Sequence, residues 1–197
     1  MIPEFKNKPN DHLQLRYQTS EGVQNLDYFI SRSIAVVGVV IAIVSDCTYV
    51  LITKRSNKMR DEKGKLGVPC GYLDWDETGY EAMLREVYEE TSLHLPDYDK
   101  FNVFDNNKKP FEIKDNPLTD KHQNVSLLYL TVLDFINDCD EFPRQLESFT
   151  CHETAMVMWL KLSELYTMAY TENTWAFNHD ETIKSAVKFN ARNFERK

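Results

Sequence analysis

Residues 71–93 read GYLDWDETGYEAMLREVYEETSL, and the interpretation of the whole chain depends on them. Thr78 is followed three residues later by Glu81, the spacing of a capping box. A capping box satisfies backbone N–H groups that the first turn of a helix leaves free. We therefore predict a helix that begins at Thr78 and ends at about Thr91.

Three glutamates lie close together on this predicted helix. Glu86, Glu89 and Glu90 stand at i, i+3 and i+4, so their carboxylates converge and repel one another. One side of the helix is apolar and packs, and the other presents charge. Arg85 alone is too little cation for three carboxylates, whereas Mg²⁺ and Mn²⁺ take oxygen ligands of this kind. The alternative for an arbitrary helix is a solvated acidic face.

The spacing of the whole stretch resembles the signature of the Nudix hydrolases. The defining positions present are Gly71, Glu77, Arg85, Glu86, Glu89 and Glu90. Ser92 stands where the family usually has glycine, which ends the helix in the left-handed conformation. We expect Ser92 to affect the end of the helix and not the activity, because this position holds no ligand.

The resemblance implies a reaction and a set of roles. Nudix hydrolases cleave the pyrophosphate linkage of a nucleoside diphosphate joined to another moiety, with Mg²⁺ or Mn²⁺. The implied metal ligands are Glu86, Glu89, Glu90 and the carbonyl of Gly71. Glu77 and Arg85 match the positions that brace the loop and helix by pairing with each other. A surface salt bridge is the alternative for that pair.

The general base is left open by the resemblance. Family members take it from a glutamate of the signature or from a carboxylate on a later loop. Glu153 lies where such a later carboxylate often sits, and His152 is a weaker candidate. The catalytic residues implied in this way are Glu77, Arg85, Glu86, Glu89 and Glu153.

Length and composition indicate one globular domain with some additional segments. The chain has 197 residues, of which 42% are hydrophobic and 27% are charged. Its formal net charge of −8 argues against nucleic acid and anionic membranes as partners. Four cysteines without CxxC spacing predict a reducing, cytoplasmic location. No run is apolar enough to span a bilayer, and we see no secretion signal.

The remaining elements follow from hydrophobic patterning. We expect a loose arm over 1–20, a helix near Val23–Ser31, and a buried strand over Ile34–Val44. Further strands are predicted at 48–54, 100–104, 125–133 and 155–160, a helical turn at 163–166, and a terminal helix at 180–192. The resemblance, which covers roughly residues 34–189, implies an α/β fold of the Nudix type, an α/β/α sandwich with a mixed sheet and a central catalytic loop and helix. We divide the chain into an arm, 1–33, and a Nudix hydrolase domain, 34–197.

Substrate recognition is less firmly indicated. Lys54 and Arg55 open a basic connection that could bind phosphate, and Trp75 could stack on a base; a solubilising loop and simple packing are the alternatives. Residues 175–183 resemble the closing helix of Nudix domains that act on ADP-ribose-like and NAD-related compounds. We therefore favour a dinucleotide or nucleotide sugar as substrate.

Several competing functions remain open. Within the same enzyme class they are hydrolysis of nucleoside triphosphates, of dinucleoside polyphosphates, or of an RNA 5′ end. A different class is a nucleotide-sensing module that binds without cleaving. Those regulators pair the fold with a DNA-binding segment and often lose signature carboxylates, whereas this chain keeps every one and its tail is short. Many relatives are dimers, and the N-terminal arm could serve a homodimer interface.

Overall fold

The computed structural model describes residues 11–20, 22–104, 107–118, 122–146, 152–167 and 174–194. It separates into two compact units, residues 1–33 and residues 34–197. Among the described residues, none of the helices has the length and apolarity needed to cross a bilayer.

The first unit contains an antiparallel hairpin. Strand β1, Asp11–Thr19, pairs with β2, Gly22–Ile30, in a register that runs from Asp11 opposite Ile30 to Thr19 opposite Gly22. The predicted loose arm and helix near Val23–Ser31 are therefore wrong where the structure describes them; residues 1–10 lie outside the described part. The physical reason is that residues 22–30 contain β-branched Val23 and Ile30 and aromatic Tyr28 and Phe29, which favour a strand over a helix, and that they pair with β1 along their whole length.

A mixed sheet forms the centre of the second unit. Within its described residues seven strands take part, in the order β5-β4-β3-β8-β7, with β6 paired to β3 and β9 paired to β4. The strands are β3 Ile34–Val44, β4 Cys47–Arg55, β5 Leu66–Gly67, β6 Cys70–Tyr72, β7 Glu112–Lys114, β8 Val125–Asp134 and β9 Thr154–Lys161. Strands β3 and β8 are parallel and the other pairs are antiparallel, so the predicted mixed sheet is confirmed.

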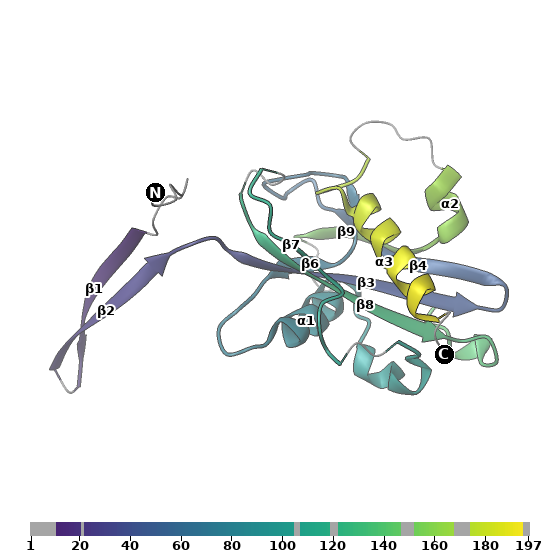
Figure 1. Ribbon diagram of the computed structural model, residues 1–197, viewed down its shortest axis with the longest axis horizontal. Coiled ribbons are helices and arrows are strands. Elements are labelled where there is room, and N and C mark those ends of the chain that lie inside the picture. Colours follow the sequence, from purple (N-terminus) through teal and green to yellow (C-terminus); the bar gives the residue numbers. More distant parts are fainter. Residues whose placement is uncertain are drawn as a thin grey trace, which may run out of the picture. The chain divides into compact units, whose positions relative to one another are not determined.

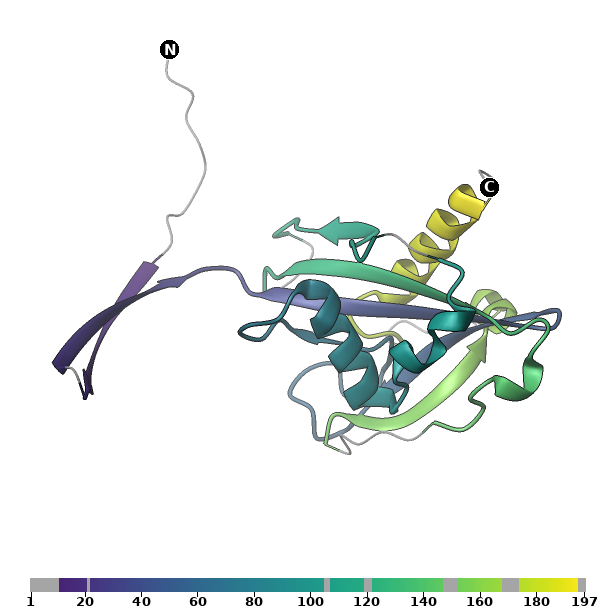
Figure 2. The same ribbon diagram turned by 90° about the horizontal axis from the view of Figure 1, so that it is seen from below.

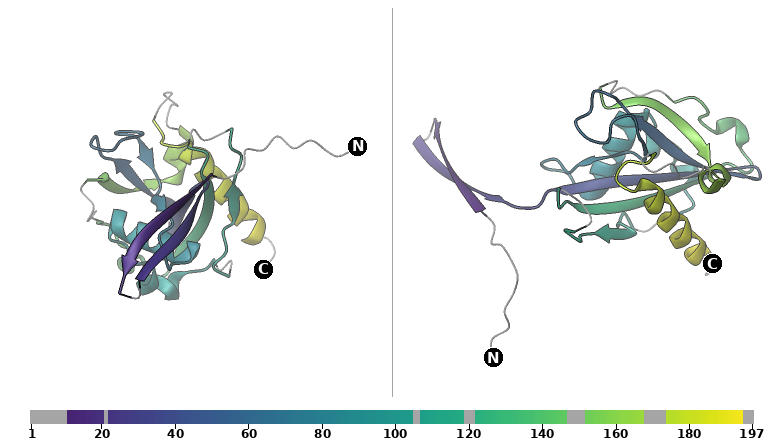
Figure 3. Two further views of the ribbon diagram at one scale, coloured as in Figure 1. Left: turned by 90° about the vertical axis from the view of Figure 1, so that its left-hand side faces the viewer. Right: turned by 90° about the horizontal axis from the view of Figure 1, so that it is seen from above.

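Helices cover both faces of this sheet. Helix α1, Gly79–Thr91, packs on one face and α3, His179–Phe194, on the other (Figures 1 and 2). The views in Figure 3 show the same layers from the side and from above. A short helix α2, Leu162–Thr167, follows β9, and two 3₁₀ helices, η1 Leu95–Phe101 and η2 Cys139–Glu141, complete the described elements. The α/β/α layering expected from the sequence is confirmed.

The alternation of β3 divides the core into two layers. Val36, Val40 and Ala42 face α1, whereas Val39 and Ile41 face α3. All five side chains are buried, as a strand covered on both faces requires. The continuous β-branched run therefore becomes the central strand of the sandwich.

Gly38 sets the distance between β3 and α1. A Cβ at this position would lie 2.8 Å from Cγ2 of Val87 and 3.2 Å from Cγ of Met83. The backbone of β3 is thus in direct contact with side chains of α1, which only glycine allows here. A glycine within a strand often marks such a close approach of two backbone segments.

The segment after α1 differs from the prediction. Residues 95–101 form η1 rather than the start of a short strand at 100–104, and only Asn102 makes an isolated bridge, with Leu133. Pro96 lies in the first turn of η1, where its missing N–H costs nothing. Phe101 packs on Phe135 with ring centroids 4.4 Å apart, so core packing also favours the helical turn.

Both ends of α1 are capped, the first by the predicted capping box and the second in the usual geometry, although we expected Ser92 to alter it. Oγ1 of Thr78 accepts the backbone N–H of Glu81 at 3.3 Å, and Oε2 of Glu81 accepts the N–H of Thr78 at 2.8 Å. Ser92 ends the helix in the left-handed conformation, with φ 60° and ψ 8°, and its N–H donates to the carbonyl of Tyr88. The serine therefore keeps the cap geometry that glycine usually provides.

We predict that Ser92→Gly is more stable than Ser92→Ala by about 1 kcal/mol, because a Cβ is unfavourable in the left-handed region. Both variants lose the serine hydroxyl, so their difference isolates the backbone effect. Urea unfolding of the two proteins would measure it. Equal unfolding free energies would show that the cap carries no strain.

Candidate active site

Gly71 lies directly against the carboxylate of Glu86. Strand β6 places Gly71 opposite Val36 of β3, and a Cβ on Gly71 would overlap the Glu86 carboxyl group. Glu86 is only 7% exposed. The signature glycine is thus required by close packing of the β6 backbone on α1.

Arg85 connects Glu77 to the helix. Its Nε donates to Oε2 of Glu77 at 3.1 Å and its Nη2 donates to Oε1 at 2.7 Å, a bidentate pair. Nη2 also donates to the carbonyl of Tyr72 at 3.0 Å, which ties the loop to the helix. The hydrogen bonds from Arg85 hold the pKa of the Glu77 carboxyl below its usual value.

The same guanidinium holds two of the helix glutamates. Nη1 of Arg85 donates to Oε1 of Glu86 at 2.7 Å and to Oε2 of Glu89 at 3.2 Å. Burial nevertheless raises the pKa of Glu86 above its ordinary value, and the charges of Glu89 and Glu153 add to that rise. One cation therefore neutralises Glu86 and Glu89 only in part.

Glu90 is more deeply buried than the sequence suggested. It is 5% exposed; its Oε1 accepts the N–H of Cys70 at 3.3 Å and its Oε2 accepts the hydroxyl of Thr154 at 3.4 Å. Burial, together with the charge of Glu86, raises the pKa of Glu90 to about 8, against the lowering effect of the hydrogen bonds from Cys70 and Thr53 and of the charge of Arg55. The alternative of a solvated acidic face does not fit Glu86 and Glu90, because β6 and β9 lie against them.

The donor set fits a hard divalent cation by its chemistry. Glu86, Glu89 and Glu90 offer carboxylate oxygens. Glu86 and Glu90 are buried in a region of surplus negative charge. Among the described residues, however, no three acidic, His or Cys side chains already stand close enough to chelate an ion. Glu86 and Glu89 point to Nη1 of Arg85, so a bound cation would share or displace these bonds.

The structure brings Glu153 and Arg55 towards the acidic helix. Glu153 is exposed, precedes Thr154, and its carbonyl accepts the N–H of Ser56 at 2.7 Å. Arg55 follows Thr53 on one face of β4, and its charge acts on Glu90. His152, the weaker candidate for the base, is exposed at the start of the same turn.

Lys54 and Trp75, the other two residues proposed for substrate binding, differ from Arg55 in position. Strand alternation puts Lys54 on the face of β4 that Ile52 shares, which is covered by α3. Trp75 is 82% exposed on the loop that leads into α1. The structure thus brings Arg55, but not Lys54, next to the glutamates.

Three further polar residues around the site were not predicted. Thr53 and Thr154 hydrogen-bond to Glu90, and His179 accepts the N–H of Val68 on Nδ1 at 3.1 Å. Thr53 and Thr154 lie in apolar strands, where a buried threonine gives no separate sequence signal. His179 stands at the first position of α3, next to the glycine of β5: a Cβ on Gly67 would lie 2.8 Å from Nδ1.

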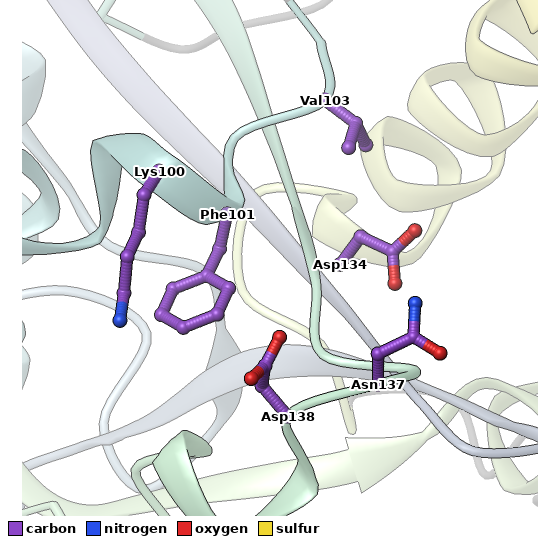
Figure 4. A pocket seen from close by; sticks show the side chains of 6 residues that line it. All are labelled: Lys100, Phe101, Val103, Asp134, Asn137 and Asp138. Carbon is purple, nitrogen blue, oxygen red and sulfur yellow. The ribbon is translucent and has the colours of Figure 1, made fainter.

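A separate hollow of about 390 Å³ lies at the other end of the sheet (Figure 4). Its lining residues are Lys100, Phe101, Val103, Asp134, Asn137 and Asp138. Asp134 pairs with Ile43 near the end of β3, whereas Gly71 pairs with Val36 near its start. This hollow therefore contains none of the signature residues.

Fold and signature together define a protein of the Nudix hydrolase class. A sequence model of the NUDIX domain matches residues 35–184, and the chain belongs to this family. By sequence, no curated protein matches the chain.

Several solved structures share the fold. A bifunctional NMN adenylyltransferase/ADP ribose pyrophosphatase from Francisella tularensis, complexed with AMP and Mn, is 20% identical with a TM-score of 0.57, and the match covers 80% of this chain and 42% of that one. The NUDIX domain of Shewanella oneidensis NrtR, complexed with ADP ribose, is 18% identical with a TM-score of 0.54 over 81% of this chain and 89% of that one. A C. elegans Ap4A hydrolase is 16% identical with a TM-score of 0.53 over 81% and 96%. The chain thus spans less than half of the bifunctional Francisella enzyme.

We predict that His179 makes the fold sensitive to acid. Burial lowers its pKa to about 3, and the charges of Lys114 and Arg55 contribute. In the unfolded chain this histidine takes up a proton near pH 6.5, whereas in the folded chain it stays neutral down to about pH 3. The free energy of unfolding therefore falls by about 1.4 kcal/mol per pH unit as the pH decreases from about 6.5 to about 3.

The measurement is urea unfolding of wild type and His179→Asn at several pH values in this range. Asparagine keeps an acceptor for the Val68 N–H but does not titrate, so the difference in unfolding free energy should shrink as the pH falls. A constant difference would contradict the buried neutral state. Glu86 and Glu90 affect the pH dependence of the unfolding free energy in the opposite direction, but they are present in both proteins, so their contributions cancel in the difference.

Proposed function

We propose that the chain is a metal-dependent pyrophosphohydrolase that cleaves a nucleoside diphosphate linked to another moiety. The observation that carries this proposal is the pair of buried carboxylates, Glu86 and Glu90, on the side of α1 that faces β6, where Arg85 pairs with Glu86. Burying two like charges on one helix is unfavourable without a compensating cation. A bound Mg²⁺ or Mn²⁺ ion would supply that compensating charge.

The roles of the side chains follow from their positions. Glu86, Glu89 and Glu90 would hold the metal, together with the carbonyl of Gly71. The metal, when bound, neutralises the diphosphate and lowers the pKa of an attacking water. Arg85 and Glu77 orient the loop and helix and do not take part in bond breaking. Glu153, exposed and within electrostatic range of Glu86, is our candidate for the general base.

We propose ADP-ribose-like compounds or other dinucleotides and nucleotide sugars as the substrate class. Support comes from residues 175–183 and from the likeness to the Francisella and Shewanella structures, whose names include ADP ribose. The likeness to an Ap4A hydrolase keeps dinucleoside polyphosphates as an alternative within the same chemistry. Nucleoside triphosphates are the other alternative.

A nucleotide-sensing role is the second candidate from another class. The fold is shared with NrtR, of which one structure contains a 27mer DNA. The presence of every signature carboxylate favours hydrolysis over sensing. A sensor would bind the same nucleotides without turning them over.

The cellular setting and assembly are also proposals. We propose a cytoplasmic protein, because Cys47, Cys70 and Cys139 are free thiols. We further propose that residues 34–197 are the hydrolase domain, and that residues 1–33, as an arm, serve a homodimer.

The decisive experiment is incubation with Mg²⁺ or Mn²⁺ and a panel of nucleotides. The panel comprises ADP-ribose, NADH, diadenosine polyphosphates, nucleotide sugars and nucleoside triphosphates. We expect metal-dependent release of AMP from ADP-ribose or a related dinucleotide, and no release after chelation with EDTA. Inorganic pyrophosphate plus a monophosphate would favour the triphosphate alternative, and tight binding of ADP-ribose without products would favour sensing.

We predict that Glu89→Gln and Glu90→Gln each lower turnover by about 100-fold or more, since even the loss of a group behind a metal ligand costs about 10–100-fold. Both variants keep the shape of the side chain, so thermal unfolding should show a folded protein. Glu81→Gln is the matched control on the same helix. Glutamine keeps the capping box, and Glu81 is exposed at the other end of α1. Wild-type rates in Glu89→Gln and Glu90→Gln would remove the ligand assignment.

A further inference from the structure

The segment that leads into α3 is fixed on both sides of Phe177. The N–H of Leu66 donates to the carbonyl of Thr174 at 2.9 Å, and the N–H of Ala176 donates to the carbonyl of Leu66 at 2.8 Å. Ala176 is fully buried, and His179 is held under Val68 by its hydrogen bond. The chain between these two anchors has little freedom.

Phe177 is presented between the anchors in an unfavourable conformation. Phe177 and Asn178 have φ values of 50° and 56°, in the left-handed region that disfavours residues with a Cβ. Phe177 is nevertheless 42% exposed, so the strain does not serve burial of its ring. Strained backbone of this kind persists where the surroundings over-determine it, and it gathers at functional sites.

Arg55 links the Phe177 ring to the acidic helix. Its guanidinium lies 5.0 Å from the ring centroid, and its Nε donates to the carbonyl of Asp61 at 3.3 Å. Arg55 pairs in the sheet with Thr154, whose hydroxyl donates to Glu90. The order in space is therefore aromatic ring, guanidinium and carboxylates.

The segment of chain that connects the anchors of the Phe177 segment to the contacts of Glu90 and Glu86 is also short. Phe177 and His179 are anchored on residues 66–68, and two residues later Cys70 donates its N–H to Glu90. Gly71 then lies against Glu86. A single stretch of backbone, 66–71, thus positions both the ring and the carboxylates.

We propose that Phe177 is the stacking surface for the nucleobase of the substrate and that Arg55 binds the adjoining phosphate. This inference deepens the proposed function and rests on it. An exposed aromatic ring next to a guanidinium matches a base joined to an anionic phosphate, because the ring offers a π-face and arginine pairs with phosphate oxygens. The class of ligand is a nucleotide that has its base on the α3 side and its diphosphate towards α1.

Two other interpretations compete with this one. Phe177 could simply shield Arg55 and the start of α3, in which case ligand binding would not depend on it. Trp75, the more exposed aromatic, could supply the stacking surface instead. Among the described residues no cation lies over the ring of Trp75, whereas the guanidinium of Arg55 lies over the ring of Phe177.

The test compares the binding of AMP and of ribose 5-phosphate by calorimetry in the presence of Mn²⁺. Phe177→Ala should weaken AMP about 10-fold, in line with the loss of base stacking, and should leave ribose 5-phosphate unchanged. Phe177→Tyr should restore AMP binding, and Phe177→Leu, which keeps size without a π-face, should not. Arg55→Ala should weaken both ligands. Ile136→Ala, an exposed apolar residue after β8, is the control.

Equal AMP affinity in Phe177→Ala and wild type, or a selective loss in Trp75→Ala alone, would overturn the proposal. Thermal unfolding of each variant separates a binding defect from a folding defect, and the tyrosine and leucine variants remain informative if alanine fails to fold. Because binding is measured without turnover, the result is distinct from that of the hydrolysis panel. A protein that binds AMP through Phe177 but hydrolyses nothing would contradict the enzyme and keep the stacking surface.

Discussion

The burial of Glu86 and Glu90 against the β6 backbone is the constraint on which the rest of this structure depends. Gly71 must lack a side chain for Glu86 to fit, and Cys70 must direct its N–H to Glu90. Gly38 must let α1 approach β3 closely enough for both contacts to form. The same packing contacts therefore determine both the position of the helix over the sheet and the pKa values of its carboxylates. A helix only slightly further from the sheet would leave the glutamates in water with ordinary pKa values.

Arg85 neutralises only part of the negative charge of the helix glutamates. Its five donors are divided among Glu77, Glu86, Glu89 and the Tyr72 carbonyl, and this fixes the loop at the cost of leaving surplus negative charge on the helix. Lysine, with one compact charge, could not bridge the loop and two helix carboxylates at once. The arrangement holds the carboxylates together and leaves negative charge for the proposed metal ion to neutralise.

Much of the fold followed from strong local signals. The continuous β-branched run of β3 and the capping box of Thr78 and Glu81 each specify one element without help from distant residues. The hairpin β1–β2 and the 3₁₀ helix η1 were missed because their patterns are short and mixed, and pairing or core contacts decide them. The site shows the same division: the signature positions were identifiable, whereas the burial of Glu90 depends on Thr154, sixty-four residues further along the chain. Phe177 lies within residues 175–183, which pointed to a substrate class, but its place beside Arg55 depends on the pairing of residues 174–176 with Leu66.

That bridge has a consequence for how such a protein can diversify. The carboxylates proposed as metal ligands belong to α1, while the Phe177 ring and the last helix are tied to the two-residue strand β5. If Phe177 stacks the base as proposed, substitutions in residues 174–178 would alter which molecule is selected and leave the carboxylates of α1 in place. Under that proposal, evolution can change selectivity without altering the residues of the reaction.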